Sequence, residues 1–413
     1  MAHGMERDDI QCRERTRTWV AGTSIRTCLH AVRRMHPPKR RGSSGRFAAW
    51  DFPEEGVGLV MKITKVTVAF SVAPPREREI RDALQLLDGG GLVEVRIEGS
   101  DGLSDVVTGT SSTGFGRLRS APGILAKIIE DELAPAIIGQ DPFLIRGIRD
   151  QLSSLTEYHG TAGIALMGIA AIDIALWDLV GHALNSPVWR LLGPVRNRIP
   201  AYAMVGWLNF SVEELKPIAE KAVAQGFRGV KMKVGAPTLE EDIERIEAVR
   251  SITGRDLRLM VDANQTFALP EAIRRGRVYQ ELGCYWFEEP LRADNHAHLA
   301  ELASVLDIRI ASGENDFGKR QFRDLFERRA VDVVQPDLRR AGGATECLEI
   351  AAMADAFDVE YASHGGGPHL HLLAAMPNAL YMESGYLPDG ATLDNGCIAL
   401  PEGPGFSRPV WQH

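Results

Sequence analysis

The chain has 413 residues, of which 45% are hydrophobic and 25% are charged, so it is long enough for one large barrel or two ordinary domains. Its formal net charge of −8 argues against a general nucleic-acid-binding protein, because neutralising phosphates needs a basic surface. No apolar run approaches the roughly 20 residues that a membrane span requires, so we expect no membrane partner. Small molecules are the expected partners.

The cysteine pattern indicates a reducing compartment. The five cysteines are odd in number, widely scattered and free of any CxxC spacing, which predicts neither a disulfide framework nor a thiolate zinc site. We therefore expect a cytoplasmic protein.

Residues 1–60 differ in composition from the rest of the chain. No acidic residue occurs between Arg15 and Trp50, while arginines and lysines accumulate around turn-prone Pro and Gly/Ser clusters. Such a composition can mimic an organelle transit peptide or a basic binding arm. We favour a disordered or artefactual extension, because strand-like alternation begins only at Met61, and we assign it no function.

Residues 61–190 are expected to form an α+β domain. The runs "ITKVTVAF" and "LVEVRIEG" predict strands of an antiparallel meander. The polar stretch "GSDGLSDVVTGTSSTGFG" is interpreted as a loop. The segments "GILAKIIEDELAPAII" and "GIALMGIAAIDIALWDLVGHAL" then show helical spacing, and the second is apolar enough to be nearly enclosed.

Residues 191–385 show a different texture, in which short apolar runs alternate with amphipathic helices. The eight runs are "PAYAMVG", "GVKMKVG", "RLMVDAN", "YWFEEP", "RIASGEN", "VDVVQPD", "VEYASH" and "ALYMES". This alternation predicts a closed parallel α/β barrel of the TIM type. Active sites of such barrels lie at the carboxyl ends of the strands, so the polar residues that end the runs are the candidates. They are Lys233, Asp262, Glu288, Glu314, Asp337, His364 and Glu383.

Three of these residues predict a metal site. Asp262, Glu288 and Glu314 end successive strands at intervals of 26 residues. Three carboxylates in one cleft repel one another unless a cation neutralises them, and ligands that are all oxygen favour Mg²⁺. A single acidic residue in such a place would more simply be a helix N-cap or a surface charge.

The other strand ends supply acid–base groups. Lys231 and Lys233 are two residues apart on a strand, so both point inward, and we expect their mutual repulsion to lower the pKa of Lys233 until it can act as a base. Structural pairing of both lysines with the carboxylates is the alternative.

The next two strands can supply a second base. Asp337 can accept the Nδ1 hydrogen of His364 and make the imidazole more basic. Glu383, if protonated, could donate a hydrogen bond to a developing oxyanion, or else it simply packs against the lysines. A metal that holds a carboxylate between two bases indicates proton abstraction alpha to that carboxylate through an enediolate.

These residues carry a resemblance to the enolase superfamily, and to its mandelate racemase subgroup in particular. The chain is similar from about Met61 to its end, through "KMK" at Lys231 to Lys233, "VDANQ", "FEEP", "SGEN", "QPD", "SHGGG" and "MES". The pairing of a Lys or His base with Mg²⁺ is a documented pattern of that superfamily. The muconate lactonizing branch fits less well, because it places a lysine where this chain has Asp337 and usually an aspartate where it has Glu314.

The resemblance implies a fold and a site. It implies a (β/α)7β barrel with an N-terminal capping domain that residues 386–413 return to complete, and a homo-oligomer. It also implies Mg²⁺ on the three carboxylates, a base at Lys233, a His364–Asp337 dyad and an electrophilic acid at Glu383. Asn264, Asn315 and Arg340 are predicted to bind substrate, with loop ordering or solvation as their alternatives.

The expected reaction is dehydration of an acid sugar to a 2-keto-3-deoxy acid. Lys233 or His364 would remove the alpha proton, and His364 as imidazolium would assist departure of the beta hydroxyl. A racemase or epimerase of a 2-hydroxy acid needs the same residues and remains the alternative. A non-catalytic barrel is less consistent with so complete a site.

Overall fold

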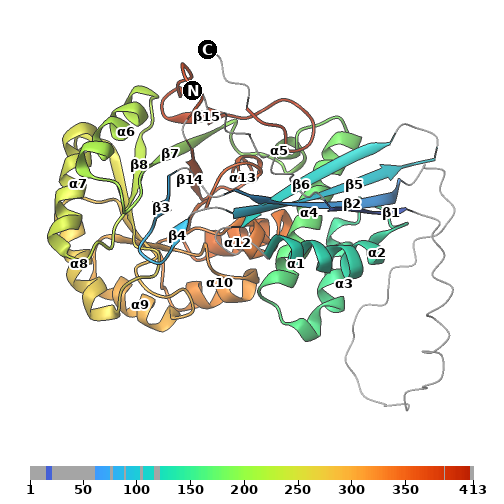
Figure 1. Ribbon diagram of the computed structural model, residues 1–413, viewed down its shortest axis with the longest axis horizontal. Coiled ribbons are helices and arrows are strands. Elements are labelled where there is room, and N and C mark those ends of the chain that lie inside the picture. The colour runs from blue at the N-terminus through green and yellow to red at the C-terminus, as the bar shows by residue number, and fades with distance from the viewer. Residues whose placement is uncertain are drawn as a thin grey trace, which may run out of the picture.

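The computed structural model describes residues 15–20, 61–74, 78–87, 90–102, 106–115, 121–385 and 387–409. Within them a twisted antiparallel sheet with its helices lies beside a closed barrel (Figure 1). These two parts correspond to the α+β domain and the barrel predicted above.

The capping domain is built on a sheet in the order β1-β2-β5-β6. Its strands are β1 (Arg15–Val20), β2 (Lys62–Ala73), β5 (Gly90–Ser100) and β6 (Val107–Phe115), all paired antiparallel. The helical elements are α1 (Ala121–Ile128), η1 (Ile129–Leu133), α2 (Ala134–Ile137), α3 (Ile145–Leu155), η2 (Glu157–His159), α4 (Ile164–Ala183) and α5 (Val188–Leu191). Alternate residues of β2 and β5 bury Val66, Val95 and Ile97 against these helices.

Two predictions for this domain are wrong. Residues 15–20 form β1, which pairs with β2, although we expected no ordered structure before Met61; the rest of residues 1–60 lies outside the described residues. The stretch interpreted as a loop contains β6. Gly109 explains this strand, because a Cβ there would lie 2.1 Å from the carbonyl oxygen of Ala175, so only glycine lets β6 approach α4 so closely.

Helix α4 also corrects the expectation about apolar runs. Among the described residues it is the one helix whose 20 residues are long and apolar enough to cross a membrane. Most of the helix is buried between the sheet and the barrel, as Ile169, Ala175 and Leu179 show. It is therefore a core helix, and the apolar face all round it is explained by burial on both sides.

The barrel has eight parallel strands, closed by the pairing of β14 with β7. They are β7 (Arg198–Gly206), β8 (Gly229–Lys233), β9 (Arg258–Asp262), β10 (Trp286–Glu288), β11 (Arg309–Ser312), β12 (Val333–Val334), β13 (Glu360–Ala362) and β14 (Ala379–Ser384). The outer helices are α6 (Val212–Ala224), α7 (Leu239–Thr253), α8 (Leu269–Glu281), α9 (His296–Val305), α10 (Gly318–Glu327), α11 (Leu338–Ala341), α12 (Ala344–Ala356) and α13 (His369–Leu373). The (β/α)7β architecture is thus confirmed.

The barrel interior is filled rather than hollow. Tyr202, Trp286 and Tyr381 pack edge to face inside it, with ring centroids 5.4 Å apart for Tyr202 and Trp286. Such a layer closes the space beneath the carboxyl ends of the strands and leaves the functional groups on top of it.

Two further segments join the barrel to its surroundings. A hairpin of β3 (Ile80–Arg81) and β4 (Leu86–Leu87) docks on the loop after β7, where Leu208 donates a backbone hydrogen bond to Arg81 at 2.7 Å. The C-terminal segment adds β15 (Cys397–Ala399) antiparallel to β7 and then contacts α4 and α5 of the capping domain.

Candidate active site

Three carboxylates meet at the carboxyl end of the barrel. Asp262 and Glu288 are the last residues of β9 and β10 and lie opposite each other in the parallel register, while Glu314 follows β11 by two residues. All three are buried, and each offers an oxygen within 4.8 Å of the others. The predicted cluster is therefore formed by neighbouring strands in phase.

The electrostatics of this cluster fit a divalent cation. Burial raises the pKa of Glu288 to about 7, and the charge of Asp262 adds to the effect. Burial would also raise the pKa of Asp262, but the two lysines outweigh it and lower that pKa to about 2. Buried, hard oxygen donors that repel one another are a suitable set for Mg²⁺.

Both lysines of "KMK" point into this cluster. Lys231 Nζ lies 2.6 Å from Glu288 Oε1 and 3.3 Å from Glu383 Oε1. Lys233 Nζ lies 2.5 Å from Asp262 Oδ2. Met232 packs outward into the core between barrel and helices. The alternation of the strand is as predicted.

The prediction that the pKa of Lys233 is lowered is wrong when no cation neutralises the carboxylates. Burial lowers the pKa of Lys233, but the charge of Asp262 opposes it and the net pKa is raised. The pKa of Lys231 is raised well above its ordinary value, because Glu288 and Glu383 outweigh its burial. Neutralising these carboxylates with a cation removes the interaction that keeps Lys233 protonated.

The structure brings His364 and Asp337 together as expected. His364 Nδ1 lies 2.9 Å from Asp337 Oδ2, and Nε2 lies 3.0 Å from Glu314 Oε2. Burial opposes protonation, but Glu314, Asp337 and Glu383 raise the pKa of His364 to about 9. A quarter of its side chain is exposed, so the ring can reach a substrate.

Glu383 is the last but one residue of β14 and interacts with both Lys231 and His364. Burial raises its pKa, but Lys231 and His364 outweigh burial and lower the pKa to about 2. The carboxylate also accepts a hydrogen bond from the backbone of Gly365 at 2.7 Å. This low pKa favours the carboxylate, and the contact with Lys231 at 3.3 Å is the predicted alternative of packing against the lysines rather than the protonated hydrogen-bond donor.

The three predicted substrate-binding residues differ in their surroundings. Asn264 is buried in a left-handed conformation (φ 43°), and its Oδ1 has no hydrogen-bond partner among the described residues. Asn315 donates to both oxygens of Glu289, at 2.8 and 3.0 Å, which makes it a support of the site. Arg340 donates to the carbonyl of Glu314 at 3.1 Å. A substrate role remains a prediction for each.

Sequence reasoning missed several supporting groups. Glu289 is fully buried at φ 39°, and burial together with Glu314 raises its pKa well above the ordinary value. The doubled acid of "FEEP" could have drawn attention to it. Gln335 and Trp286 each donate to Glu288 Oε2 at 3.0 Å, and no local signal in the sequence indicates these contacts.

Helix α7 anchors the loop that follows Lys233. Asp242 accepts hydrogen bonds from the backbone of Gly235 and Ala236 at 3.0 to 3.1 Å, and from Tyr279 at 2.6 Å. Its buried ion pair with Arg275 is 2.5 Å long. An amphipathic helix thus also carries a buried polar network.

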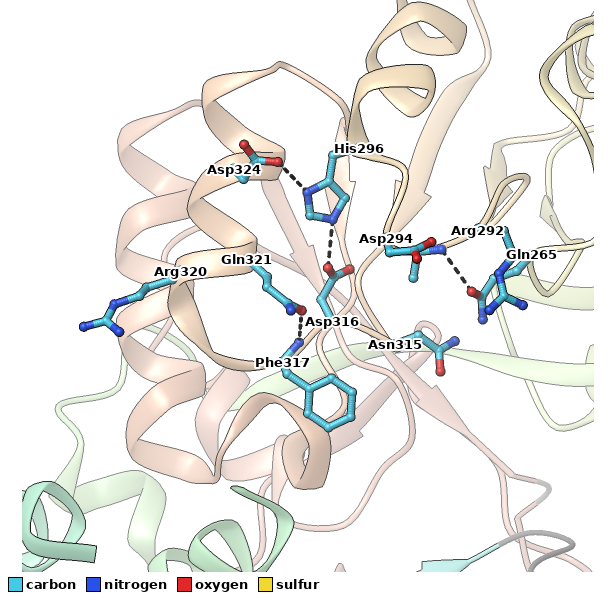
Figure 2. A pocket seen from close by; sticks show the side chains of 11 residues that line it. Gln265, Arg292, Asp294, His296, Asn315, Asp316, Phe317, Arg320, Gln321 and Asp324 are labelled. Carbon is cyan, nitrogen blue, oxygen red and sulfur yellow. Dashed lines mark hydrogen bonds and ion pairs between the residues drawn. The ribbon is translucent and has the colours of Figure 1, made fainter. Parts of the chain in front are cut away.

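A cavity of about 630 Å³ lies beside the carboxylate cluster rather than at it. Figure 2 shows His296 held between two carboxylates, Asp316 at 2.9 Å and Asp324 at 2.8 Å. Burial lowers the pKa of His296, but the interactions with Asp316 and Asp324 outweigh burial, so the net pKa is raised. These contacts fix the loop that carries Glu314 and Asn315.

Family models match most of the chain. Residues 64–193 match the mandelate racemase/muconate lactonizing enzyme N-terminal domain, and residues 214–410 match an enolase C-terminal domain-like model.

Individual proteins agree with this match. The chain is 33% identical over 298 residues to an arabinonate dehydratase of Saccharolobus solfataricus, covering 68% of this chain and 80% of that one. A racemase structure from Streptomyces coelicolor with bound magnesium has a TM-score of 0.75 at 31% identity, covering 82% and 95% of the two chains. The structure of L-talarate/galactarate dehydratase from Salmonella typhimurium gives 0.75 at 30% identity, covering 89% and 93%. With its fold, its strand-end residues and these matches in agreement, the chain belongs to the mandelate racemase/muconate lactonizing enzyme family of the enolase superfamily.

Proposed function

We propose that this protein is a Mg²⁺-dependent lyase that dehydrates an acid sugar, an aldonate or aldarate, to a 2-keto-3-deoxy acid. The observation that carries the proposal is the placement of two proton-transfer groups at opposite ends of the carboxylate cluster. Lys233 contacts the first carboxylate, Asp262, and His364 contacts the last, Glu314. A substrate bound between them presents its alpha carbon to both. The names of the two dehydratases among the similar proteins support the reaction class.

Asp262, Glu288 and Glu314 would hold Mg²⁺. When bound, Mg²⁺ supplies positive charge to the substrate carboxylate and so makes the alpha proton more acidic. The magnesium in the similar racemase structure supports this assignment.

The proton transfers are assigned to side chains of this protein. Lys233, with 8% of its side chain exposed, is placed to remove the alpha proton, whereas Lys231 is 1% exposed and serves as a charge partner. His364, which is more exposed, holds a proton on Nε2 that it can give to the departing beta hydroxyl. Asp337 stabilises the imidazolium form through Nδ1.

The test is a screen of the purified protein with Mg²⁺ against mono- and diacid sugars, in which semicarbazide absorbance reports 2-keto acid formation. Activity should appear with one substrate class, and Lys233→Ala and His364→Asn should each abolish it. Arg323→Met, at an exposed position on α10, should retain it. Product formation that survives both site variants would contradict the proposed roles.

Racemisation or epimerisation of a 2-hydroxy acid is the second candidate, since the same pair of bases can serve two faces of one carbon. It would produce no 2-keto acid in the screen. Exchange of the alpha proton in D₂O with inversion at that carbon would establish it. The absence of both activities would favour a non-catalytic barrel.

A further inference from the structure

Arg339 folds its side chain back onto the aspartate of the proton-transfer dyad. Its Nη2 lies 2.6 Å from Asp337 Oδ2 and its Nε lies 3.2 Å from Asp337 Oδ1. The same Oδ2 accepts from His364 Nδ1 at 2.9 Å. One carboxylate oxygen therefore joins a guanidinium to the ring that is proposed to move protons.

The hydrogen bonds of Asp337 leave its carboxylate no freedom. Besides the Arg339 side chain, Oδ1 accepts from the backbone nitrogens of Arg339 and Arg340 at 2.9 and 3.0 Å, which caps the short helix α11. With His364 this makes five donors, about as many as the lone pairs of two carboxylate oxygens can serve. The aspartate side chain is only 2% exposed, so water cannot replace a lost donor.

We propose that Arg339 is a positioning residue for proton transfer through His364. The proposal rests on the function proposed above. The planar fork of the guanidinium holds both oxygens of Asp337 and so directs Oδ2 at Nδ1 of His364. The ring is then fixed in the tautomer and orientation that present Nε2 to the substrate.

The capping role of Asp337 does not account for this arrangement. Helix α11 is capped through Oδ1 by the backbone nitrogens of residues 339 and 340, which do not depend on the arginine side chain. The side chain of Arg339 is the group that restrains Oδ2. One third of that side chain is exposed, and among the described residues its side-chain hydrogen bonds both go to Asp337.

The first readout is the histidine ring itself. At a pH high enough for the ring to be neutral, the full-length enzyme loaded with Mg²⁺ and ¹⁵N-labelled at histidine should show one tautomer for His364, assigned by the signal missing in His364→Asn. Arg339→Met should mix the tautomers, Arg339→Lys should restore part of the single form, and Arg323→Met should change nothing. A His364 signal that is identical in Arg339→Met and the unaltered enzyme overturns the proposal.

The second readout is exchange of the alpha proton in D₂O for two acids that are epimeric at that carbon. Arg339→Met should slow exchange of the epimer that faces His364 by about 10- to 100-fold, as for lost outer partners of oriented histidines. Exchange of the epimer that faces Lys233 should be unchanged, because Lys233 contacts Asp262 rather than Asp337. Equal loss on both faces overturns the proposal. If even the unaltered enzyme exchanges neither epimer, the proposed function fails, while the ring signals still decide the role of Arg339. Should Arg339→Met not fold, Arg339→Gln and Arg339→Lys provide the same comparison.

Discussion

Lys231 illustrates at the residue scale how a buried charge depends on what surrounds it. Its Nζ lies within 3.6 Å of Asp262, Glu288 and Glu383, and the side chain is almost fully enclosed. The lysine therefore acts as an internal counter-ion. In the sequence, two neighbouring lysines on a strand predict a base with a lowered pKa. The pKa is instead determined by carboxylates that lie 31 to 152 positions away along the chain.

We predict that Lys231→Met destabilises the metal-free protein by about 3–5 kcal/mol, because carboxylates lose a buried partner. Saturating Mg²⁺ should recover part of this loss, since the cation neutralises the same carboxylates, so Mg²⁺ should stabilise the variant more than the unaltered protein. Urea denaturation with EDTA and with Mg²⁺ measures both quantities. Equal stabilisation of the two proteins by Mg²⁺ would contradict the role of Lys231 as a counter-ion.

Asn264 gives a second prediction at this scale. If its unpartnered Oδ1 binds a substrate hydroxyl, removal of the side chain should cost about 1 kcal/mol, or roughly fivefold in kcat/KM. Because the residue has a positive φ, Asn264→Ala adds backbone strain and Asn264→Gly does not. Both variants should lose activity alike while binding Mg²⁺ normally. Loss in the alanine variant alone would assign Asn264 a backbone role.

At the scale of elements, helix α4 of the capping domain is tied to α12 of the barrel by Asp173. Its carboxylate accepts from the backbone and the hydroxyl of Thr345 at 3.0 and 2.6 Å. A Cβ on the neighbouring Gly343 would lie 2.5 Å from the same carboxylate. Burial raises the pKa of Asp173 from 3.8 to about 6.

The burial of Asp173 predicts a pH dependence of stability, because it outweighs the hydrogen bonds from Thr345 and raises the pKa. Between pH 3.8 and about 6 the folded protein binds a proton at Asp173 that the unfolded chain has released, so the free energy of unfolding falls as pH rises through that window. The shift corresponds to about 3 kcal/mol. Asp173→Asn should lack this loss and so gain stability relative to the unaltered protein from pH 4 to pH 7. The free energy of unfolding is measured by denaturation at each pH. If it changes with pH in parallel for the two proteins, Asp173 makes no such contribution.

The elements also show what could be predicted from the sequence. The barrel strands and the seven residues at their ends were predictable, because strand length and polar termination are local and one βα unit repeats about every 25 residues. Strand β6 was missed, since its glycine and hydroxyl residues are typical of loops until α4 lies against them. Arg339 was missed for the same physical reason: its proximity to Asp337 is visible in sequence, but the direction in which its side chain folds is not.

At the scale of the whole molecule, the C-terminal segment links the barrel to the capping domain. After β15 has paired with β7, the chain reaches α4, where Phe406 donates to Asp178 Oδ1 at 2.7 Å. Gly405 makes two backbone hydrogen bonds, with Ser186 in the turn between α4 and α5 and with Val188, the first residue of α5, both at 3.0 Å. The C-terminal segment thus adds a second link between the two parts of the molecule, besides the contact of Asp173 with Thr345.

We predict that Gly405→Val displaces the C-terminal segment from α4 and α5. Gly405 has φ 66°, and a Cβ there would lie 2.2 Å from Asp178 Oδ1 and 2.4 Å from the ring of His182. A β-branched residue can neither adopt this φ cheaply nor fit the space, so the segment must leave its site at a cost of several kcal/mol, about 3 or more. Thermal unfolding should shift down, and limited proteolysis should cut first after β15. Gly385→Ala, where nothing lies within 4 Å of the added Cβ, is the matched control and should leave both measurements unchanged. If Gly405→Val instead unfolds at the normal temperature with the segment still protected, the C-terminal segment is not what holds the capping domain to the barrel, and contacts such as those of Asp173 with Thr345 and of Arg149 with Glu346 carry that role.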